Sequence, residues 1–254
     1  MSILEDAERE AMHDVFVKAA VEVVDDVERV LRQPALDVTP VTPRDFRGMD
    51  VAWLEDTTRA LVSEGFTHLR DVDGTPLLAE GSPPAMVRVL LGDANTVSVA
   101  LYHARPRSPG FFLKLLLMVL GKWPKAPRVV ECTSYLDDVV LTTSNQGDVN
   151  AFEHPPWVVN RTLALGVSPA AVLTLHREQI EAHAGRVMPR MFNGFDDLNR
   201  AREEQRVAAN AWREEVGLKD TELARLLAPH GEQGQKVRPY IVAELRRRGW
   251  WKQA

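Results

Sequence analysis

The chain has 254 residues, of which 45% are hydrophobic and 26% are charged, and it carries a formal net charge of −5. These proportions are those of ordinary globular proteins and argue against wholesale disorder. The length allows one large domain or a core domain with extensions, and the negative net charge argues against a surface devoted wholly to nucleic acid.

Cys132 is the single cysteine, which excludes an internal disulfide and a thiolate metal cluster built from one chain. The first residues are acidic and lack the basic and apolar regions of a secretory signal. The longest apolar run is shorter than the roughly 20 residues that a membrane-spanning helix needs. We therefore expect a soluble, cytoplasmic protein, and nothing in the sequence indicates a metal site or a cofactor.

Residues 1–33 are predicted to form an N-terminal amphipathic helix. Ser2 and Glu5 have the spacing of a capping box, and apolar residues recur at helical spacing as far as Val30. Such a helix is much longer than the average of about 11 to 12 residues, so we expect it to pack against a partner helix or along the domain. Residues 34–50 contain three prolines and no sustained period, which is typical of a linker.

Residues 51–190 are predicted to form an α+β core domain. A helical pattern over 51–64 ends at Gly65, and β-branched residues then alternate between turn signals. Ser168 and Pro169 mark the start of a further helix, which is expected to cover one face of the sheet. The predicted fold is therefore an antiparallel sheet of about five strands packed by helices. The predicted strands are 67–72, 86–91, 96–103, 128–135 and 139–144.

Residues 191–254 are predicted to form a helical C-terminal extension. Its last two helices resemble the helix-turn-helix core of a winged-helix domain, and residues 236–254 carry six basic residues against Glu244 alone. A recognition helix needs such charge to meet phosphates, but no wing follows. An amphipathic hairpin docked on the core or on a partner, or a second membrane-interface anchor, explains the same pattern. The predicted helices are 196–216, 220–227 and 236–248.

The segment 106–127 is predicted to be an apolar insertion between two strands. Its run Phe111–Leu120 is apolar around nearly the whole helical circumference, and no acid occurs from Arg105 to Arg128. The protein's own core, an oligomer interface or an anionic membrane surface could receive it, because interfacial anchors use basic flanks and tryptophan. The candidate interaction residues are Phe111, Phe112, Leu115, Leu117 and Trp123. The candidate basic patch comprises Arg105, Arg107, Lys122, Lys125, Arg128, Arg246, Arg247 and Arg248.

Histidines are the weak candidates for catalysis. His176 and His183 lie on one face of the helix after Pro169, but seven helical residues separate them by about 10.5 Å, so one metal ion cannot reach both. The ordinary interpretation is a pair of hydrogen-bonded imidazoles at the edge of a core. His103 and His154 complete the set of candidates. Cys132 lies in mid-strand without a cationic neighbour and is interpreted as a small buried side chain.

The leading hypothesis is a non-catalytic binding or scaffold protein that self-associates or engages a protein partner through apolar helices. It rests on the long amphipathic helices and on the lack of a nucleophile elbow, a phosphate loop or a zinc-binding His-Glu-x-x-His pattern. One alternative is a peripheral membrane-surface protein that uses residues 105–128. Another is an enzyme whose site gathers His103, His154 and His176. A third is nucleic-acid binding by the C-terminal hairpin; no small-molecule ligand is indicated.

Overall fold

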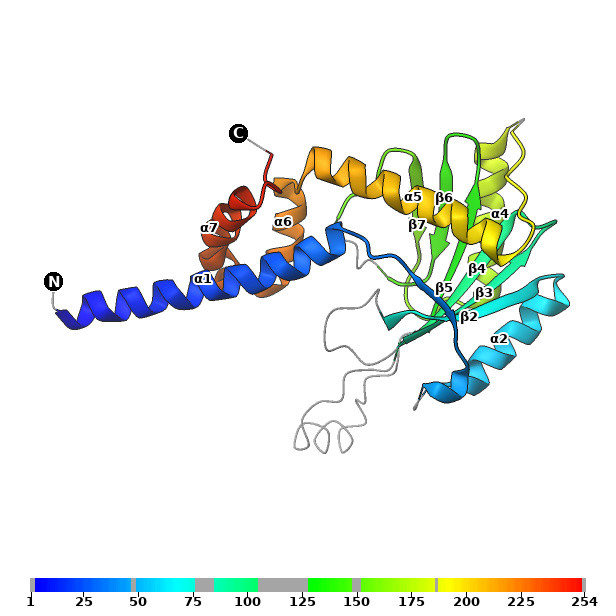
Figure 1. Cartoon of the computed structure of the whole chain (residues 1–254), viewed down its shortest axis with the longest axis horizontal. Helices are drawn as coiled ribbons and strands as arrows, with labels where there is room; N and C mark the ends of the chain where they lie inside the picture. The colour runs from blue at the N-terminus through cyan, green and yellow to red at the C-terminus, as the bar shows by residue number, and fades with distance from the viewer. Residues whose placement is uncertain are drawn as a thin grey trace. The chain divides into compact units, whose positions relative to one another are not determined.

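The computed structural model describes residues 3–46, 49–75, 85–104, 128–147, 152–185 and 187–252, with side chains described from His13 onward; Figure 1 shows these elements in chain order. The contacts divide the chain into two compact units. The helical unit comprises Met1–Pro34, Asn150–Pro155 and Gln205–Ala254, and the sheet unit comprises Ala35–Val149 and Pro156–Glu204.

The sheet unit is built on one seven-stranded sheet whose spatial order follows the chain. Neighbouring strands are antiparallel except for the last two, which run parallel. Helices and strands together confirm the predicted α+β class. The strands are β1 Asp37–Pro40, β2 Thr67–Asp73, β3 Ala85–Gly92, β4 Val97–Ala104, β5 Arg128–Tyr135, β6 Val140–Ser144 and β7 Val158–Thr162.

The predicted number of about five strands is wrong, because β1 and β7 also belong to the sheet. β1 lies in the predicted linker, contains Pro40 and buries none of its four residues. β7 likewise has no fully buried residue. Only single side chains such as Val38 and Val158 pack partly against the core, so neither strand carries a clear alternating hydrophobic pattern. Pairing with β2 and with β6 makes them strands, and local sequence does not reveal that pairing.

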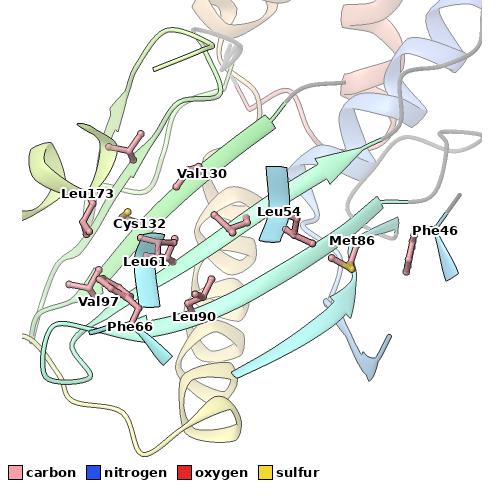
Figure 2. Packing of buried hydrophobic residues seen from close by; sticks show 13 residues of the cluster. Phe46, Leu54, Leu61, Phe66, Met86, Leu90, Val97, Val130, Cys132 and Leu173 are labelled. Atoms are coloured by element: carbon pink, nitrogen blue, oxygen red, sulfur yellow. The ribbon is translucent and has the colours of Figure 1, made fainter. Parts of the chain in front are cut away.

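One face of the sheet is covered by α2 (Val51–Ser63) and α4 (Pro169–Ala184). Each helix starts at a side-chain cap: Asp50 accepts a hydrogen bond from the Trp53 amide at 3.0 Å, and Ser168 accepts one from the Ala171 amide at 3.3 Å. Figure 2 shows the core beneath them. Its members include Leu54, Leu61, Phe66, Met86, Leu90, Val97, Val130, Cys132 and Leu173.

The opposite face is covered by the first part of α5 (Phe195–Val216). Phe192, just before the helix, is fully buried and lies edge-on to the Tyr135 ring at 5.4 Å. Side chains at helical spacing on α5 then continue this second core. It comprises Val72, Val87, Val89, Leu91, Ala100, Tyr135, Val140, Phe192, Phe195, Leu198 and Ala201.

The turn between β3 and β4 has an unusual backbone. Asp93, Ala94 and Asn95 all have positive φ, at 49°, 55° and 65°, a conformation that costs residues with a Cβ roughly 1–2 kcal/mol each. Arg177 of α4 holds the turn with two bonds to the Asp93 carboxylate at 2.8 and 2.7 Å, and the Phe192 amide donates to the Asn95 carbonyl at 3.0 Å. These bonds hold the turn in its strained conformation and connect it to α4 and to the segment before α5.

In the helical unit, α1 (Ile3–Leu31) packs against α7 (Gly231–Arg247). The buried side chains of α1 fall at helical spacing on one face. Helix α6 (Asp220–Leu227) completes this core. Its buried members are Ala20, Val24, Val27, Leu31, Leu218, Leu223, Leu227, Ile241, Leu245 and Trp250.

Candidate functional site

The histidines proposed for a joint catalytic site lie in separate places. His103 pairs with Arg128 at one end of β5, whereas His176 contacts Ser134 six residues further along the same strand. At roughly 3.3 Å per residue these positions are about 20 Å apart. His154 belongs to the helical unit. His183 is exposed, and its Nδ1 lies 2.8 Å from the Gln179 carbonyl, to which it donates.

His103 is buried at the end of β4, next to the start of α2. Its Nε2 accepts a hydrogen bond from the Asp50 amide at 3.2 Å, and its ring lies 6.0 Å from that of Trp53. Burial lowers the pKa of His103, so the ring is neutral and carries its proton on Nδ1. That nitrogen finds no hydrogen-bond partner among the described residues. Arg128 closes the cluster by pairing with the Asp50 carboxylate.

His176 lies at the centre of a fully buried polar network under α4. Its Nε2 is 3.1 Å from Ser134 Oγ and its Nδ1 is 3.0 Å from Thr143 Oγ1. Ser134 Oγ also lies 3.0 Å from the Thr96 carbonyl oxygen, and Thr143 Oγ1 lies 2.6 Å from Gln179 Oε1. Because a neutral imidazole carries one N–H, one of the two hydroxyls donates its proton to the ring and the other accepts from it. A serine next to a histidine suggests a nucleophile, but His176, Ser134 and Thr143 have no exposed surface. The network therefore joins α4 to the sheet.

The unfolding free energy is expected to fall in acid because of His176. Burial lowers the pKa of His176 from 6.5 to about 4. Between these two pH values the imidazole is protonated in the unfolded chain and neutral in the folded chain. Stability from this group is complete above pH 6.5 and is lost as the pH falls towards 4, by about 2 kcal/mol at pH 5. Urea unfolding at pH 7.5 and pH 5 measures the change. The His176→Gln variant should show a smaller difference between the two pH values, and an equal difference would contradict the assignment.

Cys132 is fully buried on β5 among the aliphatic side chains of the first core. Burial raises the pKa of its thiol far above the usual range. A thiolate is the reactive form of cysteine. Cys132 therefore contributes apolar volume and no nucleophile.

Polar side chains that were not predicted from the sequence line one half of the sheet face on the α5 side, over β5, β6 and β7; we call this region the polar half-face. Tyr102 of β4 donates to Glu131 Oε1 at 3.4 Å, and Thr142 bonds to Asn160 at 2.8 Å. Burial raises the pKa of Glu131, and the charge of Arg202 on α5 opposes that rise. Because Glu131 and Cys132 are neighbours on a strand, their side chains point to opposite faces of the sheet, so the sequence could place Glu131 away from the first core. The sequence could not identify the residues that Glu131 contacts on that face. The side chains in register on this half-face are Thr133, Thr142, Asn160, Glu131, Ser144 and Thr162.

Exposed apolar side chains gather on the loop between α4 and α5, which the sequence reading also missed. Val187, Met188 and Met191 are 39%, 80% and 64% exposed. The Arg190 amide donates to the Tyr135 carbonyl at 2.7 Å, which places the loop beside the β5–β6 turn. Together with the Phe192 bond to the β3–β4 turn, this bond holds the backbone on either side of Met191.

The candidate basic patch is largely ion-paired wherever it is described. Arg128 pairs with Asp50, and Arg247 pairs with Glu244 at 2.5 Å. Arg248 contacts Glu244 together with Asp25 and Glu28 of α1. Arg246 is exposed. The remaining members, Arg105, Arg107, Lys122 and Lys125, lie outside the described residues, as do Phe111, Phe112, Leu115, Leu117 and Trp123.

The predicted helix-turn-helix corresponds to α6 and α7. Gly234 allows the two helices to cross closely, because a Cβ there would lie 2.8 Å from the Leu227 carbonyl oxygen. The helical unit as a whole holds 14 lysine or arginine residues against 16 aspartate or glutamate residues. Nucleic-acid binding needs a net basic footprint, so this balance does not favour it.

No group of three or more His, Cys, Asp or Glu side chains is placed to hold a metal ion in the part of the chain that the structure describes. None of its described helices has the length and apolarity needed to cross a bilayer. Comparison with protein-family models, with curated proteins and with solved structures finds no match for this chain.

Proposed function

We propose that the protein is a non-catalytic binding or scaffold protein that self-associates. The observation that carries this proposal is the pair of exposed methionines, Met188 and Met191, on a loop whose backbone is hydrogen-bonded to the sheet turns on either side of Met191. Large apolar side chains that gather on a surface commonly mark an interaction site. Methionine suits such sites because its side chain is flexible and polarizable.

The inaccessibility of the reactive groups supports binding over catalysis. His176 and Cys132 are sealed inside the sheet unit, and His103 is 1% exposed. A general base must come within hydrogen-bond reach of its substrate proton, which these buried positions do not allow. The polar half-face around Glu131 has no nucleophile next to a base among its bonded pairs.

The backbone around Met191 is held in place without a partner. Arg190 and Phe192 donate their amides to the sheet turns on either side of Met191, and the Phe192 ring is fully buried. Pro189 further restricts the backbone between the two methionines. A loop that is already ordered loses little conformational entropy when it binds, which favours association.

Sedimentation velocity of the full chain, across a wide range of protein concentration, tests the proposal. Self-association predicts that the mean mass rises with concentration above that of one chain. A protein that stays monomeric at every concentration would contradict self-association. Parallel flotation with anionic vesicles covers the membrane alternative: binding by a strictly monomeric protein would replace the proposal with a peripheral membrane function.

A further inference from the structure

Two unpaired acids lie beside the exposed methionine loop. Asp137 and Asp138 form the exposed turn between β5 and β6 and make no ion pair with the described residues. The Arg190 amide is bonded to the carbonyl of Tyr135, two residues before Asp137. We call the surface formed by Asp137, Asp138, Val187, Met188 and Met191 the methionine–aspartate surface. It presents apolar side chains next to two carboxylates that no described cation pairs with.

Among the described residues, the nearby charged side chains are paired with one another and not with Asp137 or Asp138. Asp93 and Glu64, which lie near the same end of the sheet, are both already bonded to Arg177. Arg190, next to Met191, is paired with Asp197 at 3.3 Å. The free carboxylates of Asp137 and Asp138 therefore remain available to a basic partner.

The chain itself contains a segment of the complementary kind. Residues 105–127 hold five basic residues, no acid and the apolar run Phe111–Leu120. No other stretch of this length in the chain combines a ten-residue run that holds nine apolar residues with an acid-free basic flank. Apolar side chains flanked by positive charge match exposed methionines flanked by negative charge.

Topology favours the segment of another copy over that of the same chain. Residues 105–127 join the end of β4 to the start of β5, whereas the methionine–aspartate surface lies past the end of β5. The strand spans about 23 Å at roughly 3.3 Å per residue. The residues between Ala104 and Phe111 reach at most about 25 Å when fully extended. To dock on the surface of its own chain, the apolar run would need the residues that connect it to β4 and to β5 to be almost fully extended.

From this complementarity we infer that the methionine–aspartate surface receives the basic apolar segment 105–127 of a second copy of the chain, in a head-to-tail contact. The inference rests on the proposed self-association and identifies the two surfaces that contact each other in it. A head-to-tail contact joins unlike surfaces, so it leaves one of each free at the ends and builds open chains or rings. Mean mass then rises past that of a dimer with concentration.

Two variants, each blocking one side, test the contact by sedimentation velocity. Met188→Glu combined with Met191→Glu blocks the receiving surface, and Leu117→Glu blocks the segment. Each variant alone is expected to associate at least about tenfold more weakly than the wild type, because burial of one large apolar side chain corresponds to about a tenfold change in affinity or more. An equimolar mixture is expected to form a dimer that does not grow, because each chain supplies the surface that the other lacks.

Leu165→Glu is the matched control, since Leu165 is 58% exposed and lies between β7 and α4. It should associate like the wild type. Asp137→Asn with Asp138→Asn should weaken association and reduce its dependence on salt, which screens charge attraction. Circular dichroism of every variant establishes that it is folded.

The outcomes separate this inference from the proposed function. A wild type that self-associates while the methionine variant does so equally well would overturn the head-to-tail contact and keep self-association. A mixture of the two variants that stays monomeric would overturn it as well. A wild-type protein that is monomeric throughout contradicts both.

Discussion

Replacement of Arg88 by methionine is expected to lower the free energy of unfolding by about 3 to 5 kcal/mol, because it removes one partner of a buried ion pair. Arg88 and Asp71 are 4% and 7% exposed. The guanidinium donates to both Asp71 oxygens at 2.8 Å and to Glu55 of α2 at 2.9 Å. Burial raises the pKa of Asp71, and the bonds from Arg88 and His68 outweigh that effect and hold it below its usual value. Without Arg88, the carboxylate stays buried with too few partners.

Urea unfolding at neutral pH measures this loss. Arg59→Met is the matched control, because Arg59 lies on the exposed side of α2 and pairs with Asp56 where both side chains are at least 70% exposed. Its cost should be within about 1 kcal/mol. The double variant Arg88→Met with Asp71→Leu should recover much of the stability, since apolar residues can replace a buried pair. Equal losses for Arg88→Met and Arg59→Met would show that the buried pair between β2 and β3 adds no more stability than an exposed one.

Replacement of Glu222 by glutamine is expected to destabilise the protein by a similar amount, about 3 to 5 kcal/mol, through the helical unit. The Glu222 carboxylate is fully buried. It accepts from Arg213 at 3.0 and 3.2 Å, from the Glu153 amide at 2.6 Å and from the Lys219 amide at 2.7 Å. A glutamine amide keeps the size but turns two acceptor positions into donors, which face donors already in place.

The control for this change is Glu214→Gln, an exposed position on α5. Surface substitutions of this kind usually change stability by less than about 0.5 kcal/mol. The free energy of unfolding from urea titrations, followed by circular dichroism, compares the two variants. If Glu222→Gln proved as mild as Glu214→Gln, the carboxylate would not be the group that ties residue 153 to the start of α6.

Elements with a strong local pattern were predictable from sequence. Predicted and observed bounds agree for β5 at 128–135 and for α6 at 220–227, and α2 ends one residue earlier than predicted. Alternation of buried and exposed side chains defines the strand, and a hydrophobic face with polar ends defines the helices. The start of α7 was predicted five residues late, because 231–235 is rich in glycine and polar residues and carries little hydrophobic pattern.

The candidate sites were much less predictable. The four histidines could be listed from sequence, but their separation depends on where β4, β5 and α4 place them. The methionine loop gave no signal, because exposure of Met188 and Met191 depends on which neighbouring elements cover them. The alternating pattern of the strand places Glu131 and Cys132 on opposite faces, and this could be predicted from the sequence. The contact of Glu131 with Tyr102 depends on the pairing of β4 with β5.

By itself the sequence determined the α+β class, most helices and the five central strands, because periodicity and composition are local properties of the chain. The apolar insertion 106–127 stays a prediction. Only the tertiary structure decided that β1 and β7 complete the sheet, since neither has a fully buried residue. It also decided the buried pairs and the exposed loop. Arg88 meets Asp71 from 17 residues away, and Glu222 meets Glu153 from 69 residues away. Burial of a charge depends on such distant partners, and no local pattern carries that information.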